Sequence, residues 1–115
     1  MEAELQRLFE RVSRYFALLA EPTRLKILHV LCDGERSVTD IVARVDSTQT
    51  NVSRHLNLMY AKGVLARRRE GAMTVYSIAD ANVVSLCRAV CTQLASLADE
   101  KTVTSRTVRR FMPQN

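Results

Sequence analysis

The sequence TQTNVSRHLNLMY, residues 48–60, decides the fold expected for this chain of 115 residues. A hydroxyl at Thr48 can accept hydrogen bonds from the first helical turn, which predicts a helix that begins at Gln49. Val52, Leu56 and Met59, with Tyr60, recur at three- and four-residue spacing and predict one apolar face. The polar side chains lie off that face: Gln49, Thr50, Asn51, Ser53, Arg54 and Asn57.

The outward face of this predicted helix has no carboxylate, whereas surface helices commonly pair Glu with Lys four residues apart. Amides, hydroxyls and guanidinium groups can pair with base edges and phosphates in a DNA major groove. The segment therefore predicts a DNA-reading helix, and an ordinary capped surface helix is the alternative. The predicted contacts from this helix are Thr48, Gln49, Thr50, Asn51, Ser53, Arg54 and His55.

The preceding residues predict the rest of a helix-turn-helix. Pro22 suits the first turn of a helix that runs to about Leu31, and Gly34 can end it. A short helix from about Ser37 to Val45 then turns into the DNA-reading helix. Residues 2–19 predict a long amphipathic helix, whose wide apolar stripe points to a partner subunit.

Beyond Lys62 and Gly63 the apolar pattern changes to a period near two. Residues 64–70 and 73–78 predict two strands joined around Gly71. Three arginines on the first strand can form a solvated surface. Beside a DNA-reading helix they instead predict a wing that contacts phosphates or the minor groove: Arg67, Arg68 and Arg69.

The C-terminal part predicts one more helix and a tail. Residues 82–99 form a nearly continuous apolar face, which again points to a partner. Residues 101–115 are basic, have a weak helical signal and predict a mobile tail. We therefore expect a single domain over residues 1–100, mainly α with a β-hairpin wing, followed by the tail 101–115.

The composition favours an anionic partner and an intracellular setting. Seventeen Lys and Arg against 12 Asp and Glu give a net charge of +5. The chain has no apolar run long enough to span a bilayer and begins with an acidic stretch, so we expect it in the cytoplasm. Three cysteines in such a chain predict free thiols rather than a disulfide framework.

Four blocks of sequence together resemble the ArsR/SmtB family of small bacterial repressors: EPTRLKIL at 21–28, GERSV at 34–38, QTNVSRHL at 49–56, and RREG at 68–71 with Val75-Tyr76. The resemblance implies a winged helix-turn-helix homodimer that pairs through its first and last helices. It also implies binding to a palindromic operator, which is released when an effector arrives. The two strongly apolar helices agree with that dimer.

The inducer sites of the family are where this sequence departs from it. The cysteine pair of arsenic- and cadmium-responsive members would fall around Val38 to Val42, where no cysteine occurs. The zinc-type site on the last helix retains Asp80, but the other positions hold Asn82, Gln93 and Ser96. We therefore expect Asp80 to cap a helix, and a zinc or nickel sensor of that design is disfavoured.

Three thiols remain as candidates for an effector site. Cys87 and Cys91 are four residues apart and share one helix face. No cofactor is required, but arsenite or a soft metal ion is a possible inducer, with Cys32 as a third ligand. Oxidation by peroxide or reactive sulfur is the redox alternative. Buried cysteines can also be simple packing residues, which is the favoured interpretation of Cys32 taken alone.

The leading hypothesis is a homodimeric repressor that binds double-stranded operator DNA and senses a thiol-reactive effector. A thiol enzyme is disfavoured because the chain has no Cys-x-x-Cys and no Gly-rich phosphate loop. A winged helix that only binds proteins is a further alternative. So is a constitutive DNA-binding regulator whose cysteines are structural.

Overall fold

The computed structural model describes residues 1–97 and 105–111. Its helices are α1 (Ala3–Leu19), α2 (Pro22–Leu31), α3 (Val38–Val45), α4 (Gln49–Ala61), α5 (Ala81–Ser96) and α6 (Ser105–Arg110). Its strands are β1 (Arg36–Ser37), β2 (Leu65–Glu70) and β3 (Met73–Ile78), and they form an antiparallel sheet in the order β1-β3-β2. This is a winged helix-turn-helix, as expected, with β1 as an addition to the predicted two-stranded hairpin.

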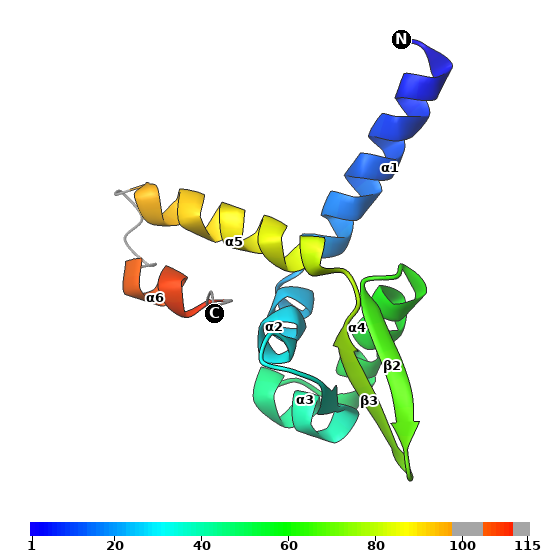
Figure 1. Cartoon of the computed structure of the whole chain (residues 1–115), viewed down its shortest axis with the longest axis vertical. Helices are drawn as coiled ribbons and strands as arrows, with labels where there is room; N and C mark the ends of the chain where they lie inside the picture. The colour runs from blue at the N-terminus through cyan, green and yellow to red at the C-terminus, as the bar shows by residue number, and fades with distance from the viewer. Residues whose placement is uncertain (98–104, 112–115) are drawn as a thin grey trace.

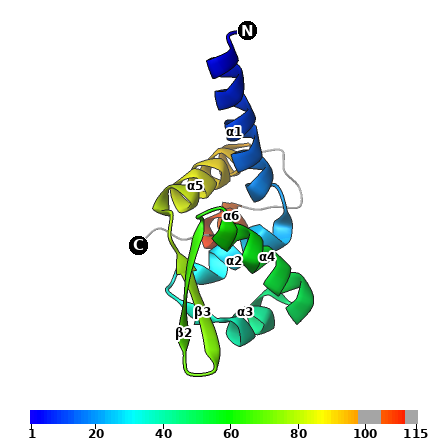
Figure 2. The same cartoon turned by 90° about the vertical axis from the view of Figure 1, so that its right-hand side faces the viewer.

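The body of the molecule consists of α2, α3 and α4 beside the sheet, and α1 and α5 project away from it (Figures 1 and 2). The most deeply buried side chains come from the helices of that body and from the start of α5, and they include Ile27, Leu28, Ile41, Val52, Leu56, Met59 and Val83. Burial of this apolar surface fixes α4 on the body and leaves its other side facing outward.

Side-chain caps set the helix starts. The Thr48 hydroxyl accepts from the Asn51 amide at 3.1 Å, so α4 begins at Gln49 as predicted. Ser37 caps α3 in the same way, and Asp80 caps α5 by accepting from the Asn82 amide at 3.0 Å. The prediction that Asp80 is a cap is confirmed.

Two turns place the helix-turn-helix and the wing. Asp46 ends α3 in the left-handed region at φ 55°, a conformation that Asp tolerates better than most residues. Gly71 has φ 61° in the tight turn between β2 and β3, where a residue without a Cβ avoids strain.

The helix α1 leaves most of its apolar stripe exposed, because Leu18 is its one fully buried residue. Leu8, Phe9 and Phe16 are 51%, 48% and 52% exposed. Val90, Leu94 and Leu97 on or just after α5 are also exposed. The predicted excess of apolar surface on these helices is therefore present in the protomer.

The C-terminal tail differs from the expected mobile segment over its described part. Residues 105–110 form α6, and the Phe111 ring stacks on the His29 imidazole with their centroids 5.3 Å apart. Through this contact, an aromatic residue of the predicted tail packs against α2. The rest of the predicted tail lies outside the described residues. No helix in the described ranges is both long and apolar enough to cross a membrane.

Candidate nucleic-acid interface

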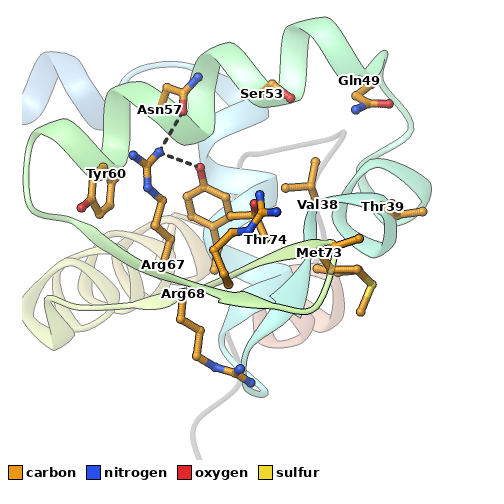
Figure 3. Close-up of a pocket in the computed structure, with 14 residues that line it drawn as sticks. Val38, Thr39, Gln49, Ser53, Asn57, Tyr60, Arg67, Arg68, Met73 and Thr74 are labelled. Atoms are coloured by element: carbon orange, nitrogen blue, oxygen red, sulfur yellow. Dashed lines mark hydrogen bonds between the residues drawn. The ribbon is translucent and has the colours of Figure 1, made fainter.

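The groove between α4 and the hairpin is the candidate site. A cavity of about 750 Å³ opens there, bounded by α4 on one side, by the hairpin on the other and by the start of α3 (Figure 3). None of the 14 described residues that line it is acidic. The residues that α4 contributes are spaced along one side of the helix: Gln49, Ser53, Asn57 and Tyr60.

A second set of polar side chains, on the outer side of α4, is held by hydrogen bonds between residues close in the sequence. The Asn51 amide nitrogen donates to the Ser47 hydroxyl at 3.0 Å, and Arg54 donates to the Asn51 carbonyl oxygen at 2.5 Å. Thr50 and Arg54 are exposed. The Arg54 guanidinium is thus oriented on the outer surface, with several donors left for an external partner.

Arg67 fixes the hairpin to α4. Its Nη1 donates to Asn57 Oδ1 at 3.2 Å and to the Tyr76 hydroxyl at 3.4 Å, and the guanidinium lies 3.8 Å from the centroid of the Tyr60 ring (Figure 3). The hydrogen bond with Tyr76 raises the pKa of Arg67 further above its already high usual value. Arg67 therefore joins the two walls of the groove while keeping its positive charge at the site.

Arg68 borders the groove, but its side chain extends from the face of the hairpin opposite to that of Arg67, because successive side chains of a strand face opposite sides (Figure 3). Its Nε donates to Glu35 Oε2 at 3.0 Å, and its Nη2 lies 2.9 Å from Glu70 Oε2. These carboxylates raise the pKa of Arg68 and offset its charge. Arg68 therefore differs from the other two arginines of the predicted wing, because carboxylates already engage its guanidinium, and the contacts of Arg67 and Arg69 with the DNA backbone stay a prediction.

His55 does not reach the outer surface. Its side chain is 6% exposed and lies between Arg24 and Glu21, with Nδ1 3.2 Å from Arg24 Nη1. Burial lowers the pKa of His55, with Arg24 and Arg54 acting in the same direction against Glu21. The structure gives no support to the predicted DNA contact by His55, because position 55 lies on the same inward side of α4 as Val52 and Met59.

Two residues of the groove, Asn57 and Tyr60, were not predicted from the sequence. Tyr60 was assigned to the apolar face, yet it is exposed and stacks under Arg67. Asn57 was placed on the outer face but not among the contacts. Its spacing of four residues from Ser53 was the available signal, because residues four apart on a helix share one side. The remaining predicted residues of α4 lie outward or in the groove.

All three cysteines are free thiols near one another at the α5 side of the body. Cys87 is buried, and Cys32 and Cys91 are half-buried. Burial raises the pKa of Cys87, and the nearby Cys91 and Cys32 raise it further. Burial likewise raises the pKa values of Cys32 and Cys91. These thiols are protonated at neutral pH and are weak nucleophiles.

An apolar cavity of about 460 Å³ lies between α1, α2, α5 and α6, and Cys87 and Cys91 are in its wall. Within residues 1–97 and 105–111 no group of three or more His, Cys, Asp or Glu residues could hold a metal ion. The three-sulfur arrangement considered from the sequence is therefore not assembled in the described part of the protomer.

Comparisons with known proteins agree with this geometry. A family model described as the arsR family of bacterial regulatory proteins matches residues 21–67. A probable mercury resistance operon repressor of Streptomyces lividans is 34% identical over 93 residues, which are 78% of this chain and 74% of the relative.

Solved structures share the fold over most of this chain. One is a homodimeric winged helix-turn-helix DNA-binding domain from Mycobacterium bovis, 28% identical, with a TM-score of 0.73 over 88% of this chain and 94% of that chain. Another is the transcriptional repressor BigR from Xylella fastidiosa, 25% identical, with a TM-score of 0.69 over 80% of this chain and 95% of that chain.

Proposed function

The chain belongs to the ArsR family of bacterial regulatory proteins, whose members are DNA-binding transcriptional regulators, and from this premise we propose that it is a homodimeric repressor of a palindromic operator. Each protomer places α4 in a major groove and the hairpin along the adjacent backbone. The groove between α4 and the hairpin carries this proposal, because it combines polar side chains with Arg67 and Arg69 and has no carboxylate among its described lining residues.

The residues divide into two roles. The side chains of α4 that read base edges are Gln49, Thr50, Asn51, Ser53 and Arg54, with Thr48 at the helix start beside the phosphates. Arg67 and Arg69 bind the DNA backbone, and Arg67 also holds the hairpin in place. Arg68 contributes at longer range, since Glu35 and Glu70 offset its charge.

The dimer forms through α1 and α5. Their exposed apolar side chains are too many for scattered surface residues, and the similar domain from Mycobacterium bovis is a homodimer. A symmetric pair of α4 helices explains why the operator is palindromic, because the twofold axis of the protein repeats the half-site.

The effector is a thiol-reactive compound that acts at Cys87 and Cys91, with Cys32 as a further candidate. The support is the spacing of Cys87 and Cys91 four residues apart on α5 and their position in the wall of an apolar cavity. A peroxide would take two electrons and two protons from a pair of thiols, giving a disulfide and two waters. A soft metal ion would instead displace the thiol protons, and arsenite would exchange its hydroxyl groups for the sulfurs, with each thiol proton leaving in a molecule of water.

A constitutive regulator with structural cysteines is the second candidate. The raised pKa values of all three thiols favour it, because metal ligands and redox sensors usually need accessible thiolates.

The test is fluorescence anisotropy of the reduced protein with the DNA upstream of its own gene. Tight binding that Arg54→Ala weakens supports the repressor, and absence of binding at low salt from a folded dimer contradicts it. The bound complex is then titrated separately with arsenite, cadmium and a polysulfide. If one of these compounds releases the DNA, and Cys87→Ser and Cys91→Ser abolish that release, the result supports the thiol effector. Cys32→Ser is compared in parallel. Tight binding that none of these compounds changes supports the constitutive regulator.

A further inference from the structure

Arg24, in the first turn of α2, contacts two other helices at once. Its Nε donates to the Leu18 carbonyl at 2.6 Å, and its Nη2 donates to the Ala17 carbonyl at 3.3 Å. Both carbonyls belong to the last turn of α1; the Ala17 carbonyl also accepts from the Ala20 backbone amide at 3.2 Å, and Arg24 is a further donor at this helix end. The remaining terminal nitrogen, Nη1, lies 3.2 Å from Nδ1 of His55 in α4.

The chemistry of this contact fixes the tautomer of His55. A guanidinium has donors and no acceptor, so Nδ1 of the imidazole must accept and the ring proton must sit on Nε2. Nε2 faces Glu21 Oε2 at 3.6 Å, and Glu21 also caps α2 by accepting from the Arg24 amide. His55 is the one buried polar side chain in the described parts of the chain. The polar contacts of His55 with Arg24 and Glu21 therefore occur on the inward side of α4, where Val52 and Met59 are apolar.

Leu18 at the end of α1 belongs to the same apolar core as Leu56 and Met59 of α4, but part of the space between the two helices is not filled. An open cavity of about 540 Å³ lies there, lined by Ala17 and Leu18 from α1, by Leu58 and Lys62 from α4, and by Arg24 between them. Arg24 and His55 thus form a polar link across a gap. The link ends on α4 beside Arg54, the residue that we place on the DNA bases.

We propose that Arg24 is a positioning residue that holds the recognition helix against the end of α1 through neutral His55, so that operator affinity requires His55 to be unprotonated. The inference rests on the proposed function of α4 in DNA binding. Arg24 and His55 connect α1, which has the exposed apolar stripe, to α4, which we propose reads DNA. A conformational change in α1 can therefore alter the position of α4.

Protonation should break the link. The charged groups that face His55 are Glu21 and Arg24 from α2 and Arg54 from α4, while α1 presents the Ala17 and Leu18 carbonyls to Arg24. A protonated ring has no acceptor for Arg24 and places a second cation beside it. Burial lowers the pKa of His55 below its usual value of 6.5, so the link is intact at neutral pH and weakens only as the pH falls below that value.

The first experiment compares operator affinity at pH 8 and pH 5.5 by anisotropy. Loss of a hydrogen bond to a charged group should weaken wild-type binding about 10-fold or more at the lower pH. In His55→Asn the amide oxygen can accept from Arg24 but does not titrate, so we expect near wild-type affinity at pH 8 and a flat profile. His29→Asn is the matched control, because His29 is the other of two histidines and stacks on Phe111.

The second experiment needs no DNA. Hydrogen exchange of the free protein should rise about 10-fold in the last turn of α1 and in α4 of Arg24→Gln, with β3 unchanged. Arg24→Lys keeps the charge but cannot reach both carbonyls and the imidazole, so it should show the same increase in hydrogen exchange. It replaces Arg24→Gln in this experiment if Arg24→Gln does not fold.

The outcomes separate this proposal from the function on which it rests. If the exchange changes as expected but the wild type binds no DNA at either pH, the repressor function fails and the link between α1 and α4 stands. If His55→Asn keeps the wild-type pH profile, or Arg24→Gln leaves both exchange and affinity unchanged, the positioning role is overturned.

Discussion

Adjacent arginines on β2 have different surroundings, and the difference follows from the strand. Arg67 lies opposite Tyr76 in the sheet register and faces α4, whereas Arg68 lies opposite Val75 and faces Glu35. Arg69 returns to the groove side. The pleat of β2 thus divides a run of like charges into two arginines on the side of α4 and one that forms ion pairs on the other side.

We therefore expect Arg69→Ala to reduce operator affinity and Arg68→Ala to change it little. Removing one phosphate contact should reduce the slope of log affinity against log salt by about 1. Arg68 is held by two carboxylates, so its loss should leave that slope near the wild-type value. Anisotropy between 50 and about 200 mM salt measures both slopes. A larger effect of Arg68→Ala than of Arg69→Ala would contradict the division.

Arg54→Ala should change sequence preference as well as affinity. We expect a loss of about 1–3 kcal/mol on the cognate operator and a smaller loss on operators altered at one half-site position, because a base-reading contact is lost. Binding to a set of single-base variants measures this. Arg44→Ala is the control, since Arg44 pairs with Asp40 on α3 at 3.1 Å. A uniform loss on every variant would place Arg54 on the backbone instead.

At the scale of elements, local signals predicted the helix starts and the hairpin. Thr48 and Asp80 are caps that act within a few residues, so the sequence contains all the information they need. The strand β1 has two residues and exists because Arg36 and Ser37 pair with Tyr76 and Val75 far along the chain. No local pattern can show such a pairing. The order of α6 likewise depends on a tertiary contact, that of Phe111 with His29.

The same distinction explains which site residues could be predicted. Most predicted α4 contacts lie outward or in the groove, since helical spacing determines which side a residue occupies. Tyr60 and Arg68 were misassigned because their positions depend on partners from other elements, which are Arg67 and Glu35. His55 was misassigned because its polarity suggested exposure, while Arg24 and Glu21 satisfy it inside the protein.

The exposed stripe of α1 leads to a prediction about assembly. Phe9→Glu places a charge in the middle of an apolar face, so the dimer dissociation constant should rise roughly 30-fold or more, equivalent to about 2 kcal/mol. Sedimentation analysis measures the shift, and operator affinity should fall with it. Gln6→Glu, a charge on the polar side of the same helix, should leave the dimer intact. An unchanged dimer in Phe9→Glu would exclude this part of α1 from the interface.

At the scale of the whole molecule, the buried imidazole links folding to pH. Burial lowers the pKa of His55 below the usual value of 6.5, with Arg24 and Arg54 acting in the same direction and Glu21 opposing them. The unfolded chain keeps the ordinary pKa, so it takes up a proton at a higher pH than the folded protein does. Below pH 6.5 the unfolded state is therefore favoured by proton binding, and well above that pH both states are neutral and His55 contributes no slope.

The free energy of unfolding should accordingly fall as the pH drops below 6.5, before the carboxylates titrate. Asp40 enters later, because Arg36 holds the pKa of its carboxyl below the usual 3.8 and the stability it contributes is lost as the pH falls through that lower value. Urea titrations across this range measure the slope. His55→Asn should remove the decline near neutral pH, whereas His29→Asn should retain it. If both variants retain it, the decline originates in other groups, and His55 is then not the residue through which mild acid loosens α4 from α1.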